Sequence, residues 1–395
     1  MTRGMVVPAI QDLLRRQGVP AWLLYDFRHS NPIAYRTLGL DERKIATRRW
    51  HYLIPAEGEP KKLVSPLEAG ILDALPGERT IYRTWQERER GLRAMLAGLE
   101  SVAMEYSPRG MVPYVSLVDG GTLELIRSFG VEVVSSADLV QETVARWSAA
   151  ELESHRLASD KLMAILEEAY AEVRRRIRAG EPLTDYDLQQ VMWRRYQEEG
   201  LVSEAPPIVA TNAHASDPHY EPDESHQTPI RAGDVLLIDF WAKLDRPRAM
   251  YADHTWMAFV GERVPEEPAK VFAVVAEARD AAIDLVREAA RSGRPLQGWQ
   301  VDDAARLVIK EAGYADYFVH RTGHNIGEET HGEGANMDDF ETHDVRALLP
   351  NICFSVEPGI YLPAFGVRSE VDVYFAPPEV IVTGGAQREM IALLA

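Results

Sequence analysis

The sequence contains almost no cysteine and no long apolar run. Cys353 is the single cysteine among 395 residues, so no intrachain disulfide can form. Its apolar neighbours predict a packed thiol in a buried strand, and this usage favours a reducing compartment. No stretch of about 18 apolar residues occurs, and the amino terminus lacks a basic segment followed by an apolar one. We therefore expect a cytoplasmic protein without a membrane span.

Basic residues are also scarce relative to acidic ones. The chain has 43 Lys and Arg against 61 Asp and Glu, a formal net charge of -18. Binding to nucleic acid or anionic lipid requires clustered cations, so we expect neither partner. The one basic run, Arg174–Arg176 with Arg178, ends a helical pattern, where cations favour the negative end of the helix dipole. We interpret it as a solvated helix face.

The composition is that of a soluble globular protein, and the length predicts two domains. In residues 1–146 helical patterns alternate with short apolar runs, an order of elements that is typical of an α/β domain. No Gly-rich phosphate loop and no nucleophile motif follows these runs. The expected strands are Ala21–Tyr25, Trp50–Ile54, Thr80–Tyr82, Val102–Tyr106 and Val131–Val134.

A second domain is predicted over residues 147–395. Ser148 and Glu151 form a capping-box pattern ahead of a long amphipathic helix that ends near Gly180. Two helices followed by strands then occur twice, which indicates an α+β domain with an internal structural duplication. The other expected helices are Thr184–Glu199, Glu267–Arg291 and Val301–Ala312; strands are expected at Ala205–Ala215, Val235–Trp241, Thr255–Val260, around Phe318, at Phe354–Val356 and at Val367–Tyr374.

Two pairs of carboxylates lie in segments that read as hairpins. Asp239 and Asp253 are symmetric about Arg246-Pro247, so a hairpin is expected to set them directly opposite each other. Glu357 and Glu370 are likewise symmetric about Pro363-Ala364. Opposed carboxylates repel each other and need a cation between them. A single acidic residue in a strand is more often a surface or ion-pair position, but two such pairs favour a metal site.

Three histidines follow in the Gly-rich stretch HRTGHNIGEETHGEG: His320, His324 and His331. A lone histidine is more often structural, whereas three in one glycine-rich segment indicate metal binding or proton transfer. Carboxylates with one imidazole suit Mn²⁺, which we favour, with Zn²⁺ or Co²⁺ as alternatives. Two such ions at roughly 3.5–4 Å generate hydroxide near neutral pH, so the expected reaction is hydrolysis.

At these residues the sequence resembles the pita-bread metallopeptidases, which include methionine aminopeptidase, aminopeptidase P and prolidase. The likeness covers about 150–395 through ordered motifs and, more loosely, a creatinase-like amino-terminal α/β domain. It implies a pita-bread catalytic domain with a pseudo-twofold repeat, two divalent ions and a homodimer. The five ligand positions of the family are filled by Asp239 in IDFW, Asp253 in YADHTW, His324 in TGHNIG, Glu357 in VEPGIY and Glu370 in VRSE.

The same resemblance implies roles for individual residues. Asp253 and Glu370 bridge both ions, Asp239 completes one site, and His324 with Glu357 completes the other. Glu357 is also expected to be the general base.

Four residues outside the ligand set also acquire roles from the resemblance. His219, in ATNAHASDPHYEP, is expected to stabilise the tetrahedral intermediate, and His331 to contact the scissile carbonyl or shuttle a proton. His320 is expected to line a proline pocket. For Arg368 two roles stay open, binding the free carboxylate of a dipeptide or supporting Glu370.

The departures from the family pattern concern the pocket, not the ligands. Trp241 follows the first ligand where a small residue is usual, and the connection from Asp239 to Asp253 is three residues longer than the common spacing. Trp256 stands at a frequent Arg position, and Gly332 at a frequent Glu position.

We expect a dipeptidase that cleaves before a carboxy-terminal proline, with Xaa-Pro aminopeptidase activity on longer peptides as the alternative. A metal-free, creatinase-like hydrolase or peptide-binding module is a third hypothesis, because fold does not fix function. The segment Arg28–Arg43 is a candidate lid over the cleft, from its own subunit or a partner.

Overall fold

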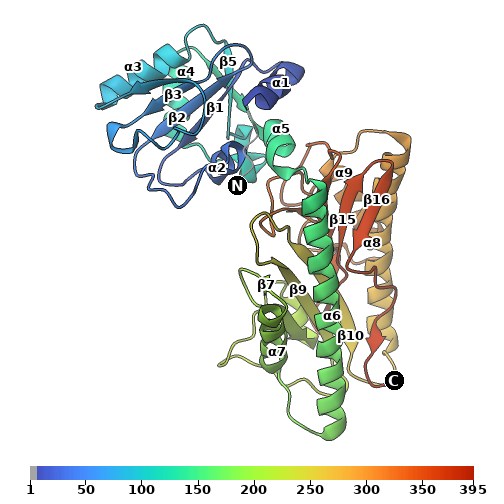
Figure 1. The fold of residues 1–395 in the computed structure, drawn as a ribbon. Helices are drawn as coiled ribbons and strands as arrows, with labels where there is room; N and C mark the ends of the chain where they lie inside the picture. The colour runs from blue at the N-terminus through green and yellow to red at the C-terminus, as the bar shows by residue number, and fades with distance from the viewer. Residues whose placement is uncertain (1–6) are drawn as a thin grey trace. The chain divides into compact units, whose positions relative to one another are not determined.

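The computed structural model describes residues 7–395 and divides into two compact units (Figure 1). The first unit ends at Val144, and the second is Ala145–Ala395. Within residues 7–395 no helix has both the length and the apolar character needed to cross a membrane. The two-domain α/β architecture expected from the sequence is confirmed.

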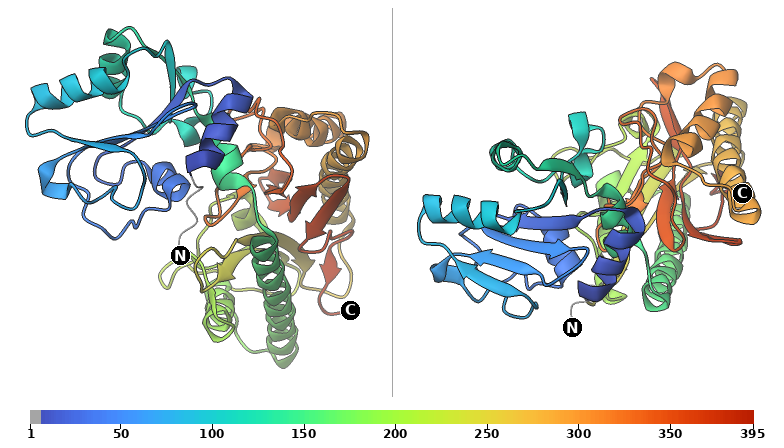
Figure 2. Two further views of the ribbon diagram at one scale, coloured as in Figure 1. Left: turned by 45° about the horizontal axis from the view of Figure 1, so that its top comes forward. Right: turned by 90° about the horizontal axis from the view of Figure 1, so that it is seen from above.

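The first unit is a six-stranded mixed sheet in the order β4-β3-β2-β1-β5-β6. Alternate residues of β1 face opposite sides: Trp22 packs with α1 and α2, and Leu23 packs with α3 and α4. The two groups of helices cover opposite faces of the sheet (Figure 2). The strands are β1 Ala21–Asp26, β2 Trp50–Pro55, β3 Lys61–Val64, β4 Glu78–Ile81, β5 Ser101–Met104 and β6 Glu132–Ser135; the helices are α1 Val7–Gln17, α2 Pro32–Leu38, α3 Trp85–Met95, α4 Gly120–Ser128 and α5 Ala137–Val140.

All five strands expected in this unit are present, with ends displaced by a few residues. The strand β3 escaped prediction because it is short and begins with Lys61 and Lys62, which do not read as a buried run. The candidate lid Arg28–Arg43 contains α2, and its role stays a prediction.

The second unit begins with the capping box predicted at Ser148. Its side chain accepts from the backbone of Glu151, whose carboxylate accepts from the backbone of Ser148, and the helix ends at Gly180 with φ 68°. Two helices and a group of strands then follow twice, so the repeated helix-helix-strand order is confirmed. The helices are α6 Ala149–Ala179, α7 Asp185–Glu198, α8 Glu266–Ser292 and α9 Gly298–Glu311; the first strands are β7 Leu201–Val202, β8 Ile208–Thr211, β9 Val235–Leu244 and β10 Ala252–Phe259.

The strands of this unit form two separate sheets and a hairpin. One sheet runs β17-β10-β9-β7 with β8 also paired to β9, the other runs β11-β12-β15-β16, and β13 pairs with β14. A single bridge between Thr255 and Glu370 connects the first sheet to the segment before β15. The remaining strands are β11 Asn325–Ile326, β12 Ile352–Val356, β13 Gly359–Leu362, β14 Phe365–Arg368, β15 Val371–Ala376, β16 Glu379–Thr383 and β17 Ile391–Ala392.

Residue alternation in β9 decides which side chains face the site. Ile238 and Phe240 pack with α6 and α7, whereas Leu237 packs in the core with α8 and α9. Asp239 has the parity of Leu237, and it therefore points away from α6. The buried Cys353 lies in β12, as predicted.

Three strand predictions in this unit were wrong. No strand forms around Phe318, which ends a short 3₁₀ helix and whose ring packs under Arg306 at 4.2 Å. The run Val367–Tyr374 is two strands, because the chain leaves β14 before joining β15. Only Ile208–Thr211 is extended within 205–215.

The short helices of the described residues are η1 Pro66–Glu68, η2 Pro108–Gly110, η3 Pro113–Val115, η4 Gln141–Ala145, η5 Asn212–Ser216 and η6 Ala315–Tyr317.

Candidate metal centre

The hairpin β9–β10 carries Asp239 and Asp253 on one face, but not directly opposite each other. Asp239 pairs with Thr255, and Asp253 pairs with Trp241. The prediction of direct opposition was therefore wrong, because the hairpin axis lies at Pro247, one residue beyond Arg246, the midpoint between Asp239 and Asp253. The two carboxylates are diagonal neighbours, a relation that still leaves them within reach of shared ligands.

The second hairpin has the axis expected from the sequence. Gly359 pairs with Arg368, and the ladder continues to Leu362 opposite Phe365. Glu357 and Glu370 lie just beyond the paired residues. Glu370 then turns away to form the bridge with Thr255, which brings the second hairpin against the first.

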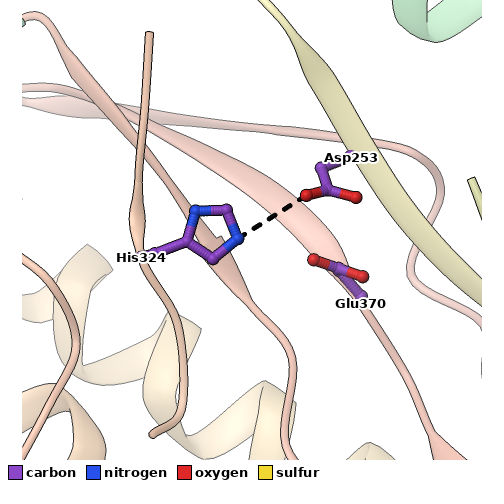
Figure 3. A group of neighbouring side chains, drawn as sticks. All are labelled: Asp253, His324 and Glu370. Atoms are coloured by element: carbon purple, nitrogen blue, oxygen red, sulfur yellow. Dashed lines mark ion pairs between the residues drawn. The ribbon is translucent and has the colours of Figure 1, made fainter. Parts of the chain in front are cut away.

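Three of the five predicted ligands form a compact buried group: Asp253, His324 and Glu370 (Figure 3). One ligand atom from each lies within 4.8 Å of the other two. His324 Nε2 is 3.5 Å from Asp253 Oδ2 and 3.4 Å from Glu357 Oε1. Asp239 is connected to the same group through Thr255 and Arg368. The structure therefore brings together all five residues, from two hairpins and the histidine loop.

The electrostatics of this group call for a cation. Burial raises the pKa of Asp253 well above its usual range, and the charge of Asp239 adds to the effect. Burial and the charge of Asp253 do the same to the pKa of Glu370. Asp239 Oδ1 is buried without a hydrogen-bond partner among residues 7–395. Crowded carboxylates, an orphaned acceptor and one imidazole fit a divalent-cation site.

Two of the predicted ligands also accept hydrogen bonds from neighbouring hydroxyl groups. The Thr255 hydroxyl donates to Glu370 Oε2 at 2.7 Å, and the Ser355 hydroxyl donates to Glu357 Oε1 at 3.0 Å. Burial raises the pKa of Glu357 to about 7. Burial lowers the pKa of His324 well below its usual range, so this imidazole stays neutral and keeps a lone pair for coordination.

Arg368 is buried beside the ligands. Its Nη2 donates to Asp239 Oδ2 at 2.5 Å, its Nη1 to Tyr361 Oη at 3.0 Å, and its Nε to Thr255 Oγ1 at 3.0 Å. All three guanidinium nitrogens thus have protein acceptors. This is the arrangement expected of a supporting role, although the ligand it supports directly is Asp239 instead of Glu370.

The remaining predicted histidines differ in their surroundings. His331 lies with its ring centroid 4.2 Å from that of His324, and burial lowers the pKa of His331 to about 4. His320 is buried, with Nε2 2.7 Å from Tyr361 Oη and Nδ1 2.6 Å from the carbonyl of Arg321. His219 lies in an exposed loop, where its backbone N–H donates to Asp217.

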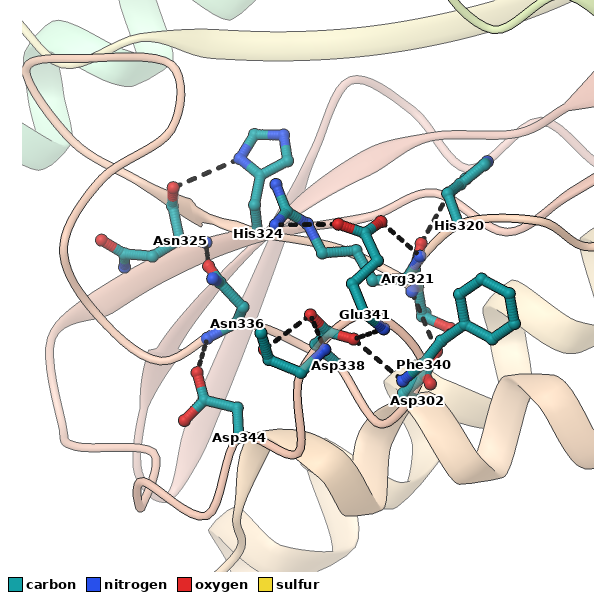
Figure 4. Close-up of polar contacts among 12 residues, drawn as sticks. Asp302, His320, Arg321, His324, Asn325, Asn336, Asp338, Phe340, Glu341 and Asp344 are labelled. Atoms are coloured by element: carbon teal, nitrogen blue, oxygen red, sulfur yellow. Dashed lines mark hydrogen bonds and ion pairs between the residues drawn. The ribbon is translucent and has the colours of Figure 1, made fainter. Parts of the chain in front are cut away.

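A polar network behind His324 fixes the loop that carries it (Figure 4). Asn336 Oδ1 accepts from the backbone of Asn325 at 2.9 Å, and the backbone of Asn336 donates to Asp344 Oδ2 at 2.8 Å. On the other side, Asp302 Oδ1 accepts from the backbone of Thr322 at 2.9 Å. The histidine loop is therefore tied to α9 and to the following segment, in addition to the short pairing of β11 with β12.

The unusual residues noted in the sequence have structural explanations in two cases. Trp256 Nε1 donates to the carbonyl of Gly384 at 2.9 Å, so the indole is tied to the loop after β16. A Cβ at Gly332 would lie 2.4 Å from Asn325 Oδ1, which excludes a larger residue there. Trp241 pairs with Asp253 in the ladder, and its Nε1 is buried without a partner in the described chain.

Sequence reasoning missed several residues that contact the predicted ligands or lie beside them. Their hydroxyl, phenol, guanidinium and carboxylate groups were not singled out, and nearness in the sequence to a predicted ligand was the only available signal. They are Thr255, Ser355, Tyr361, Arg321 and Asp372.

With this geometry established, comparison with known proteins identifies the class. Residues 157–377 match the model of metallopeptidase family M24, and the chain belongs to that family. The pita-bread resemblance is therefore confirmed.

Individual relatives are more distant. The chain is 26% identical over 344 residues to a "Probable dipeptidase PepE" of Mycobacterium tuberculosis, covering 86% of this chain and 84% of the relative. It is 31% identical over 182 residues to an "Xaa-Pro dipeptidase" of Pyrococcus furiosus, covering 46% of each. The crystal structure of dipeptidase PepE from Mycobacterium ulcerans superimposes with a TM-score of 0.73 at 22% identity, over 98% of this chain and 96% of that one.

Proposed function

We propose that this protein is a metal-dependent peptidase that hydrolyses Xaa-Pro dipeptides, using Asp239, Asp253, His324, Glu357 and Glu370 to hold two divalent ions. The observation that carries the proposal is the convergence of these carboxylates and one neutral imidazole in a buried group. Membership of family M24 supports a peptidase. The preference for dipeptides is supported by the name of a relative that matches over most of both chains.

The ions, when bound, supply Lewis acidity and lower the pKa of water for attack on the peptide carbonyl. The chain's own residues bind, orient and move protons. Glu357 accepts a proton from the attacking water, and the Ser355 hydrogen bond to Oε1 leaves Oε2 for the proton.

The histidines act on the peptide side of the centre. His331, beside His324, donates a hydrogen bond to the scissile carbonyl or passes a proton to the leaving proline nitrogen. His219 stabilises the charge of the tetrahedral intermediate. His320, whose ring is tilted against that of Tyr361 with centroids 5.4 Å apart, lines the pocket for the proline ring.

The test compares Ala-Pro and Met-Pro with a longer Xaa-Pro peptide, using metal-stripped protein with and without added Mn²⁺, Zn²⁺ or Co²⁺. We expect Mn²⁺-dependent cleavage of the dipeptides. Cleavage mainly of the longer peptide assigns the chain as an Xaa-Pro aminopeptidase instead. Absence of cleavage together with absence of bound metal overturns the peptidase proposal and favours a metal-free relative.

We also propose a cytoplasmic homodimer. The single buried cysteine and the lack of disulfides suit a reducing compartment. Light scattering of the purified protein tests the dimer, and a monomer at micromolar concentration contradicts it.

A further inference from the structure

One hydrogen bond joins the two sheets of the second unit directly behind the metal centre. The backbone N–H of Asp253 donates to Asp372 Oδ2 at 2.9 Å. Asp372 lies in β15, where its backbone pairs with Ser355 on one side and Thr383 on the other. The backbone of Asp372 therefore pairs within its own sheet, and its side-chain carboxylate is the acceptor for the N–H of Asp253.

The need for a side-chain acceptor follows from the topology. The sheets containing β10 and β15 are separate, and the bridge between Thr255 and Glu370 is the only pairing recorded between these segments of the described chain. Two residues from this bridge, at Asp253 and Asp372, the two strands no longer form a ladder. The N–H of Asp253 therefore lacks a backbone partner. A buried unsatisfied N–H costs about 1–3 kcal/mol. Asp372 removes this cost at the residue that carries a predicted bridging ligand.

Asp372 also packs against a histidine of β10. Its carboxylate is fully buried, and His254 Nδ1 lies 3.5 Å from Oδ2. His254 follows Asp253 in the strand, so its ring projects to the opposite face, towards α6. There His254 Nε2 lies 2.9 Å from the hydroxyl of Ser159. The imidazole thus spans from α6 to the carboxylate.

A second imidazole approaches Asp372 from α6. His155 Nε2 lies 3.9 Å from Asp372 Oδ2 and 2.7 Å from Thr383 Oγ1. Its Nδ1 donates to the carbonyl of Tyr251 at 2.7 Å, which fixes the ring orientation. The ring is also covered by Trp147, with centroids 5.2 Å apart. Asp372 therefore has little freedom to move.

We propose that Asp372, which packs against His254 and His155, is a positioning residue for Asp253, so that this buried carboxylate sets the affinity of the metal centre. The inference rests on the ligand role assigned to Asp253 in the proposed function. It does not depend on the peptide that is cleaved. Groups behind a metal ligand act by fixing its orientation before the ion arrives.

The experiment measures Mn²⁺ binding to the metal-free full-length protein by titration, without substrate. We expect Asp372→Ala and the similarly branched Asp372→Leu to weaken Mn²⁺ binding by about 10- to 100-fold, the usual cost of removing an outer partner of a ligand. Asp372→Asn keeps an oxygen acceptor for the N–H of Asp253. It should therefore bind Mn²⁺ nearly as well as the unmodified protein.

Glu105→Gln is the matched control for the general effect of losing a buried carboxylate. Glu105 is fully buried in the first unit, where it accepts from Trp22 at 2.7 Å and Asn31 at 2.6 Å. This variant should lose thermal stability while its Mn²⁺ affinity stays unchanged. His254→Gln, which keeps Asp372 intact, serves as a second probe and should weaken binding less than Asp372→Leu.

The outcomes separate the two proposals. Folded Asp372→Ala or Asp372→Leu that binds Mn²⁺ as tightly as the unmodified protein overturns the positioning role and leaves the proposed function standing. If Asp372→Asn loses as much Mn²⁺ affinity as Asp372→Leu, the positioning role is also overturned, because the hydrogen-bond acceptor at residue 372 then does not set the affinity. Unmodified protein that binds no Mn²⁺, Zn²⁺ or Co²⁺ overturns the proposed function and this inference together.

Discussion

The guanidinium of Arg368 hydrogen-bonds both Asp239 and Tyr361 beside the candidate metal centre. Nη2 lies 2.5 Å from Asp239 Oδ2, and Nη1 lies 3.0 Å from Tyr361 Oη. Tyr361 in turn contacts His320 at 2.7 Å. A predicted ligand and a predicted pocket residue are thus connected through one buried arginine, and this connection makes the role of Arg368 testable.

Replacing Arg368 by Ala should lower activity equally on Ala-Pro and on amidated Ala-Pro. The substitution removes a charged hydrogen bond from Asp239, worth about 1.5–3 kcal/mol, or roughly 10- to 100-fold in kcat/KM. Steady-state kinetics on both substrates provide the measurement, with Arg368→Lys as the variant that keeps the charge. A loss confined to the substrate with a free carboxylate would instead assign Arg368 to substrate binding.

Replacing Glu357 by Gln should reduce kcat by about 10²- to 10⁴-fold, the usual contribution of a general base. Gln keeps the size of the side chain and one oxygen, but it cannot accept the proton at neutral pH. Ser355→Ala is the control, because it keeps the Glu357 carboxylate and removes only the Ser355 hydroxyl, which donates to Glu357 at 3.0 Å and accepts from the backbone N–H of His324 at 2.9 Å. Activity of Glu357→Gln comparable to that of Ser355→Ala would assign the base to another residue. Bound metal should be quantified for both variants.

Acid should destabilise the first unit through His51. This histidine is buried, stacks on Tyr25 at 5.0 Å, and has no hydrogen-bond partner on either ring nitrogen within residues 7–395. Burial, with the charge of Arg88, lowers its pKa to about 3. The neutral folded form is therefore fully favoured above the unfolded pKa of about 6.5, and that stability is lost as pH falls from about 6.5 towards about 3.

The expected slope from this one group approaches about 1.4 kcal/mol per pH unit within that window. Urea unfolding at pH values between 7.5 and 4, followed by tryptophan fluorescence, measures it. His51→Gln cannot gain the proton, so its stability should fall less steeply with acid. Parallel slopes for the two proteins would show that His51 does not contribute.

Replacing Gly323 by Ala should destabilise the loop beside His324. A Cβ there would lie 1.9 Å from the carbonyl oxygen of Ser355, which is backbone and cannot move aside. Overpacking of this kind costs about 1–3 kcal/mol. Gly327→Ala in the same stretch is the control, because its nearest neighbours lie at 3.9 Å. Thermal unfolding should show a lower Tm for the first variant only, and equal Tm values would contradict the prediction.

The sequence alone determined the helices of the second unit and the segments that carry the predicted ligands. Local signals were sufficient there: Ser148 and Glu151 define a capping box whatever the tertiary context, and the apolar period of α8 marks a buried face. The carboxylate pairs and the histidine segment were singled out because buried charges are costly without a purpose, and the resemblance to the pita-bread family completed the predicted ligand set.

Only the tertiary structure decided how these residues meet. The register of β9 and β10 depends on the long connecting loop and on packing against two layers, so Asp239 came to pair with Thr255 instead of Asp253. The contact between Asp372 and Asp253 depends on where two sheets separate, which no local pattern encodes. Sequence specifies chemistry residue by residue, whereas contacts between residues more than 100 positions apart follow from the packing of the whole unit.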